Sequence, residues 1–230
     1  IRNVGDRMSN GIKWTGYLYM SLLSFSAFLL EYVSIFVIEG FFLHVDIWNY
    51  TPYQRSIHCI IMAVLWAAVI GSILLFSRRR YDFPVKNLDT EKISSRDWIA
   101  AFLCLAACKV MTFIDWHTWK IIGEAKGKSV FSFLTQYLYY IFEVGLVLLI
   151  IMFGQKAAET GLKRESRIPF GGIILALTWG VFHFVSRGVG LEIWNGISCM
   201  LFSVLGGIMY LKMRKRCLYS YLLLAVGYLL

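Results

Sequence analysis

The stretch Pro169–His183, PFGGIILALTWGVFH, guides the interpretation of the whole chain. It reads as an apolar helix with a single titratable side chain, His183, near its far end. A second apolar run upstream, QYLYYIFEVGLVLLIIMF, carries one carboxylate, Glu143. Placing an ionisable group at membrane depth costs at least about 2.5 kcal/mol for a carboxylate at the helix centre, and such residues are usually functional. We therefore take Glu143 and His183, on neighbouring apolar helices, as the best candidates for a functional site.

The composition predicts a polytopic membrane protein. Of the 230 residues, 58% are hydrophobic and 16% are charged, whereas soluble domains contain about 25% charged residues. The predicted spans use most of the chain, so we expect a single integral membrane domain over residues 1–230. The formal net charge is +9, but the basic residues stand at span ends, where they orient the protein and meet anionic lipid. This pattern argues against nucleic acid as a partner.

About seven apolar segments are predicted to form an all-α transmembrane bundle, since a hydrocarbon core about 30 Å thick requires about 20 apolar residues per helix. The last run, CLYSYLLLAVGYLL, is short for a full span, and we expect it to continue beyond Leu230. The basic stretch GQKAAETGLKRESRI is predicted to lay its polar face along the membrane surface. The predicted spans cover residues 14–38, 56–76, 98–119, 130–153, 169–186 and 193–211, before the run from 217.

Lys and Arg residues gather on one side of the predicted bundle. Of the 23, 17 fall on the side of the N-terminus and five on the opposite side, with Lys109 inside a span. The positive-inside rule therefore places the N-terminus in the cytoplasm. The paired glycines Gly171-Gly172 and Gly206-Gly207 are expected to let two helices approach closely. Cys104 and Cys108, one helical turn apart, are interpreted as small apolar residues in packed helices rather than a metal pair.

The two candidate residues each allow two interpretations. His183 follows Trp179 by four residues, so the two side chains share a helical face. It could act as a base or a metal ligand, or it could hydrogen-bond to a neighbouring helix. Glu143 could activate a water as a general base. It could also be a protonated carboxyl bonded to a backbone carbonyl, or a partner of Lys109.

The other ionisable residues give weaker signals. Asp115 and His117, in FIDWHTW, are two residues apart and do not share a helical face, so an interfacial position beside tryptophans is favoured over a metal site. His44, Asp46 and His58 are weak candidates individually. The sequence contains no HExxH, GxSxG or phosphate-loop motif, which disfavours zinc proteases, serine hydrolases and nucleotide-driven pumps. Nothing in the sequence indicates a cofactor.

From about Phe142 to the end, 142–230, the chain resembles the CPBP family of intramembrane proteases. This family comprises the CAAX prenyl endopeptidases and the bacterial Abi (bacteriocin self-immunity) proteins. LTWGVFH matches the aromatic-x-x-x-His motif of the family through Trp179 and His183. FEVGLV, which retains Glu143 and a following glycine, is the preferred counterpart of the motif EExGWR. An alternative counterpart is AETGLK, which retains Glu159.

The resemblance implies a bacterial cell-membrane protein with an incomplete catalytic set. In the family, two glutamates activate a water, while histidines and an asparagine support the water and the oxyanion. The resemblance makes Glu143 and His183 the candidate catalytic residues, and Trp179 and Glu159 the candidate substrate-binding residues. We expect a degenerate homologue, a pseudoenzyme, that binds a membrane-associated peptide or partner protein. The family residues are replaced at four positions, Phe142, Val147, Ala225 and Leu229.

Two alternative functions make different demands on the structure. An active, divergent endopeptidase requires Glu143 and His183 to face one another across a water, in a cavity open to the cytoplasm. A transporter-like bundle would line a polar path with Glu31, Lys109, Glu143 and His183, and its polar cavity should extend to both sides. Transporters usually show internal symmetry or broken helices, and neither is evident in this sequence.

Overall fold

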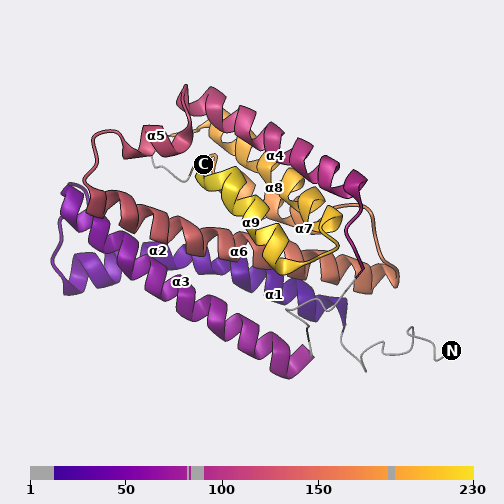
Figure 1. The fold of residues 1–230 in the computed structure, drawn as a ribbon. Coiled ribbons are helices and arrows are strands. Elements are labelled where there is room, and N and C mark those ends of the chain that lie inside the picture. Colours follow the sequence, from indigo (N-terminus) through magenta and orange to yellow (C-terminus); the bar gives the residue numbers. More distant parts are fainter. Residues whose placement is uncertain (1–12, 82, 84–90, 186–189) are drawn as a thin grey trace.

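The computed structural model describes residues 13–81, 83, 91–185 and 190–230, and in these ranges the protein consists of helices and turns without a β-strand (Figure 1). The predicted all-α class is therefore confirmed for the described residues. The elements are α1 (Trp14–Ser26), η2 (Ala27–Leu29), α2 (Leu30–Val33), η3 (Ser34–Phe42), α3 (Pro52–Tyr81), α4 (Ser95–Trp116), α5 (Lys120–Ala125), α6 (Val130–Leu162), α7 (Phe170–Leu175), η4 (Ala176–Gly180), α8 (Ile193–Lys212) and α9 (Cys217–Leu229).

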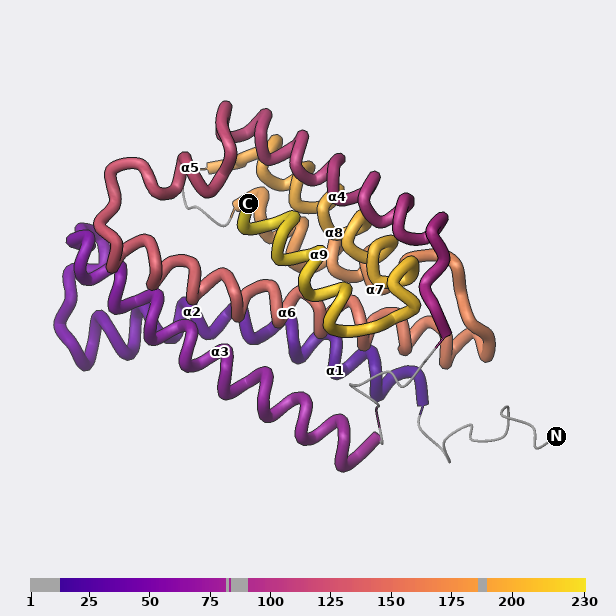
Figure 2. The backbone as a smooth tube through the Cα atoms, viewed as in Figure 1, coloured from indigo at the N-terminus to yellow at the C-terminus, as the bar shows by residue number. Residues whose placement is uncertain are grey.

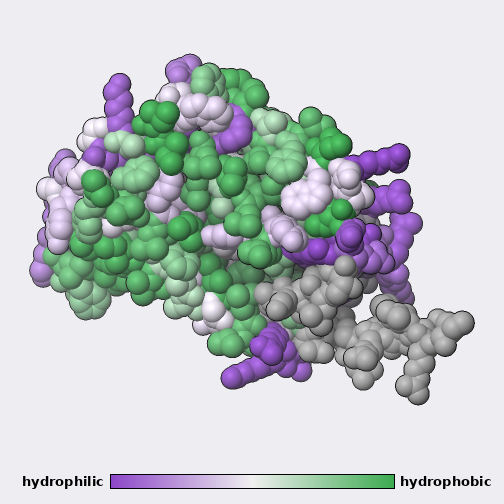
Figure 3. Space-filling view, in the orientation of Figure 1, coloured by the Kyte–Doolittle hydropathy of each residue, from purple (hydrophilic) through white to green (hydrophobic). Residues whose placement is uncertain are grey.

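Five helical segments are long and apolar enough to cross a membrane. The other two apolar helices, 170–180 and 217–229, are shorter. On the face shown in Figure 3, apolar side chains cover most of the middle, and many of the polar ones lie towards the ends. The five long segments are Trp14–Phe42, Pro52–Tyr81, Ser95–Ala125, Val130–Leu162 and Ile193–Lys212. Four of the Lys and Arg residues counted for the orientation, Arg2, Arg7, Lys86 and Arg187, lie outside the described ranges, as does Ser186, the end of the span predicted over 169–186.

Helix α6 is the centre of the bundle. In its most apolar window 61% of the residues are buried, against 11–39% in the other four long segments. The helices α1, α2 and α3 lie along one side of α6, and α4, α7, α8 and α9 lie along the other (Figures 1 and 2). Helix α6 continues to Leu162 and ends at Lys163 in the left-handed conformation. The prediction that the stretch after Phe153 lies along the membrane surface is therefore wrong for residues 154–162, because they extend this central helix.

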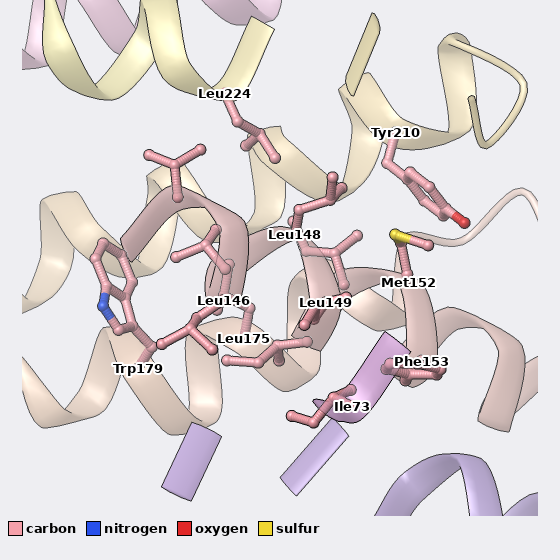
Figure 4. Close-up of a cluster of buried hydrophobic side chains, with 14 of the residues drawn as sticks. Ile73, Leu146, Leu148, Leu149, Met152, Phe153, Leu175, Trp179, Tyr210 and Leu224 are labelled. Atoms are coloured by element: carbon pink, nitrogen blue, oxygen red, sulfur yellow. The ribbon is translucent and has the colours of Figure 1, made fainter. Parts of the chain in front are cut away.

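Close contacts between glycines and backbone hold α7 against both α6 and α8. A Cβ atom added at Gly171 would lie 2.0 Å from the carbonyl oxygen of Ile151 on α6. A Cβ atom added at Gly172 would lie 2.9 Å from the Cα of Gly207 on α8. Small residues at helix interfaces allow this approach, so the role predicted for both glycine pairs is supported where the structure gives their contacts. Large buried side chains then fill the space around the three helices (Figure 4).

The first long segment departs from α-helical winding at two places. A short 3₁₀ stretch, Ala27–Leu29, interrupts the α-helix, and the carbonyl oxygen of Ala27 accepts a hydrogen bond from Trp66 Nε1 at 2.9 Å. The segment then becomes a π-helix from Ser34 to Phe42. A π-helix brings residues i and i+5 together, and the Ser34 hydroxyl donates to Glu39 at 2.6 Å. Irregular winding, which the sequence did not reveal, thus accompanies a buried carboxylate.

The two ends of the bundle differ in charge. The basic end, as we name it, carries the C-terminal ends of α3, α6 and α8 with the basic residues 78–80, 163–164, 212 and 214–216. The opposite end carries the turn 43–51, helix α5 with the turn that follows it, and the beginning of α8. The candidate site lies towards the opposite end.

Candidate functional site

A cavity of about 1150 Å³ lies among the helices in the half of the bundle nearer the opposite end. Ligand sites in proteins commonly have volumes of about 300–1,000 Å³, so this space is large enough for an organic ligand or part of a peptide. Exposed residues of its lining, among them Pro52, Asp115 and Ser129, stand at the opposite end, where the cavity reaches the surface. Each of the main helical segments contributes to the lining, from Phe28 on η2 to Tyr228 on α9.

Glu143 lies on the α6 wall of this cavity and is only 5% exposed. Its Oε2 atom accepts a hydrogen bond of 2.9 Å from the Tyr228 hydroxyl on α9. Among the described residues, no Lys, Arg or His nitrogen lies within 4.0 Å of the Glu143 carboxylate. Lys109, the partner considered in the sequence analysis, instead donates to the carbonyl oxygen of Val226 at 3.2 Å. The interpretation of Glu143 as the partner of Lys109 is therefore wrong.

Trp179 and His183 also line the cavity, on the segment that begins with α7. Their rings lie 4.1 Å apart, and His183 Nδ1 is 2.7 Å from the carbonyl oxygen of Trp179. Trp179 is 1% exposed, and its indole N–H has no hydrogen-bond partner in the described structure. The predicted one-face arrangement of Trp179 and His183 is present, and both share a cavity with Glu143.

Lys120 and Tyr228 belong to the same group of side chains, although the sequence analysis did not single them out. The Lys120 ammonium donates to the carbonyl oxygen of Tyr228 at 2.8 Å. It also lies 4.0 Å from the ring centroid of Tyr228 and 4.6 Å from that of Tyr140. In the sequence, Lys120 follows Trp119 and resembles an ordinary charged residue of a loop. No spacing in the sequence indicates that it contacts α9. Lys120 is nevertheless only 7% exposed.

A second set of polar side chains occupies the α2–α3 side, around Glu39. The Glu39 carboxylate accepts a hydrogen bond from Tyr50 Oη at 2.6 Å and lies 2.8 Å from His58 Nδ1. The other ring nitrogen of His58 lies 3.5 Å from Glu31, which lines the cavity together with His58 and Tyr50. Burial and the hydrogen bond to Glu39 raise the pKa of the Tyr50 hydroxyl above its usual range. His58, weak as a single residue, thus bridges two carboxylates.

Glu159 lies apart from the cavity, near the basic end. One of its carboxylate oxygens accepts from Gln155 and from the Ser166 backbone N–H, at 3.0 and 3.2 Å. The other oxygen lies 2.8 Å from Lys215 Nζ. The structure therefore brings together Glu143, Trp179 and His183, and places Glu159, the fourth candidate, in a different cluster that ties α6 to the turn after α8.

Asp115 and His117 occupy different positions at the end of α4. Asp115 lies on the last turn of α4, whereas His117 closes that helix in the left-handed conformation with φ of 53°. Within the described residues, no group of three or more His, Cys, Asp or Glu side chains has an arrangement able to hold a metal ion. Asp115 contributes to the cavity lining instead.

No family model, curated protein or solved structure in our comparisons matches the chain. The fold and composition define the class, a helical protein with several candidate membrane spans. The resemblance to the CPBP family rests on the short motifs around Glu143 and His183.

Proposed function

We propose that this protein is a seven-span integral membrane protein of the bacterial cell membrane that binds a membrane-associated peptide or partner segment in its large cavity. The supporting observation is the convergence of Glu143, Trp179 and His183 on one cavity, although they come from two separate segments of the chain. Aromatic side chains beside a few placed polar groups are typical of ligand sites. Under this proposal the chain is a degenerate CPBP homologue.

The depth of Glu143 fits a site within the membrane. Glu143 follows Val130, the first residue of α6, by 13 positions, which corresponds to about 20 Å along an α-helix. A hydrocarbon core is about 30 Å thick. With the N-terminus and the basic end in the cytoplasm, the cavity opens on the outer side. This orientation differs from the one required by the protease hypothesis, in which the cavity opens to the cytoplasm.

An active endopeptidase is the second candidate. Glu143 and His183 line one cavity, which favours it. Water activation also needs an oxyanion partner, and the family residues for that role are replaced by Ala225 and Leu229. We therefore place binding before cleavage.

A transporter has weaker support. The cavity lies in one half of the bundle, and the side chains of Leu146, Ile150 and Phe153, all fully buried, pack along α6 towards the basic end. The irregular winding of the first segment is the observation in its favour. In the described conformation, the cavity is open towards one side of the bundle only, which suits a binding site better than a transport path.

The test is an assay with the purified protein and membrane peptides, both prenylated and unmodified. We expect the wild type to bind a peptide without cleaving it, and Glu143→Ala and His183→Ala to weaken binding. Glu165→Ala is the matched control, because this side chain is 93% exposed and lies at the basic end. Turnover by the wild type that both substitutions abolish would establish the protease instead. Peptide affinity unaffected by either substitution would reject the cavity as the binding site.

The orientation has its own test. Single cysteines at Arg78, Lys163 and Arg214 should be labelled by a membrane-impermeant thiol reagent only after the cells are opened. Each should be placed in a variant in which the five native cysteines are replaced, since all five are free thiols. Labelling of any of the three cysteines from outside intact cells would contradict the proposed orientation.

A further inference from the structure

The charges around the cavity are unevenly matched. Four carboxylates and three Lys or Arg side chains contribute to its lining, and one pair among them, Lys128 and Glu124, forms an ion pair. The remaining carboxylates therefore outnumber the remaining basic side chains. The four acids are Glu31, Asp115, Glu124 and Glu143, and the three bases are Arg55, Lys120 and Lys128.

Three of these carboxylates, Glu31, Asp115 and Glu143, have no Lys or Arg nitrogen within 4.0 Å among the described residues, and Asp115 is exposed to solvent. Glu143 is 5% exposed, and among the described residues its carboxylate accepts a side-chain hydrogen bond from the neutral Tyr228 hydroxyl at 2.9 Å. Glu31, on the other wall, is approached by His58 at 3.5 Å and by the Tyr139 hydroxyl at 3.4 Å, which are long contacts. A buried carboxylate without a charged partner is costly. Glu143 is in that position, whereas Glu31 already lies near His58, so a positive group in the cavity would be stabilised chiefly by Glu143.

Aromatic rings line the same cavity as these carboxylates. Cations are attracted to the faces of such rings by about 0.5–2 kcal/mol. The protein already uses this interaction, since the Lys120 ammonium lies over the rings of Tyr140 and Tyr228. Because Lys120 donates to a backbone carbonyl and stands more than 4.0 Å from Glu143, it does not directly pair with that carboxylate. Nine aromatic residues line the cavity: Phe28, Tyr50, Trp116, Tyr139, Tyr140, Trp179, Phe182, Phe202 and Tyr228.

We propose that the cavity selects a lipophilic cation, an apolar or aromatic body that carries a positive charge, with the charge placed near Glu143 and the body among the aromatic rings. The inference rests on the proposed ligand-binding role of the cavity and adds the charge of the group that enters it. Glu31 on the facing wall adds a second, weaker attraction.

The experiment compares two probes of the same shape and opposite charge, tetraphenylphosphonium and tetraphenylborate. Their affinities for the purified full chain are measured in detergent at about pH 8, where an ordinary carboxyl is ionised. We expect the phosphonium to bind at least about tenfold more tightly than the borate. Glu143→Gln should lower the phosphonium affinity by about tenfold and leave the borate affinity the same or higher. Glu165→Gln, at the exposed basic end, should change neither.

Glu31→Gln is the second variant, since this side chain is 34% exposed and its replacement disturbs packing less. It should lower phosphonium affinity by about threefold, without the same effect on the borate. Equal affinities of the wild type for the two probes, or a preference for the borate, would overturn cation selection. An equal loss of affinity for both probes in Glu variants that keep the melting temperature of the wild type would also overturn it, because the carboxylate charge would then not distinguish the cation from the anion. The peptide assay above is independent of these outcomes and decides the proposed function separately.

Discussion

Replacing Gly171 by alanine should separate helix α7 from α6 and thereby disturb the site. The added Cβ atom would lie 2.0 Å from the Ile151 carbonyl oxygen and 2.8 Å from the carbonyl carbon. Both belong to backbone, which cannot rotate away as a flexible side chain can. Relief requires α7 to move by about 1 Å, roughly the gap to van der Waals contact. Overpacking of this kind typically costs about 1–3 kcal/mol, and we expect the upper part of that range.

Gly71→Ala is the matched control for this change. Gly71 lies within α3, and a Cβ atom added there would meet nothing within 4 Å. Alanine is favoured over glycine in a helix by about 0.8–1.0 kcal/mol, so this variant should be as stable as the wild type or more stable. Thermal unfolding in detergent, followed by tryptophan fluorescence, gives the melting temperatures of the two variants and the wild type. Equal melting temperatures for Gly171→Ala and Gly71→Ala would refute the packing argument.

Two further perturbations test the polar clusters. The pKa of Tyr50 is raised in the folded protein by burial and by Glu39, so its contribution to stability is complete below about pH 10, the ordinary pKa of tyrosine, and is lost as the pH rises further. The stability advantage of the wild type over Tyr50→Phe should therefore shrink above about pH 10, and a constant difference in melting temperature would contradict this. Glu159→Gln should lower stability by about 1.5–3 kcal/mol, because the carboxylate bonds charged and backbone donors. It should leave peptide and phosphonium affinities unchanged, and a weakened affinity would restore Glu159 as a ligand-binding residue.

Much of the helical architecture could be predicted because it depends on local sequence. A run of apolar residues bounded by charges specifies a membrane helix wherever it occurs, so the beginnings of α1, α6 and α8 fall close to the predicted positions. The end of α6 was missed because the residues after Phe153 are polar, yet they continue the helix, and Glu159 forms its contacts with a turn far along the chain. The winding changes at Ala27 and Ser34 depend on tertiary partners and have no local signal.

The candidate site was only partly accessible to sequence reasoning. Glu143 and His183 stood out because each is an ionisable residue in an apolar run. Lys120 did not, since its burial depends on two tyrosine rings from α6 and α9 that no spacing connects to it. The same holds for His58, which becomes notable only when Glu31 and Glu39 of another segment are placed beside it.

The position of Tyr228 on α9 has a consequence for biosynthesis. The carboxylate of Glu143 enters the membrane with α6, whereas its hydrogen-bond donor is synthesised 85 residues later. Chains are made from the N-terminus, and the earlier parts begin to fold before the later ones exist. During that interval Glu143 has to be protonated, hydrated or held by the insertion machinery. A ribosome stalled between α6 and α9 would therefore carry an intermediate whose central helix has yet to receive the group that satisfies its carboxylate.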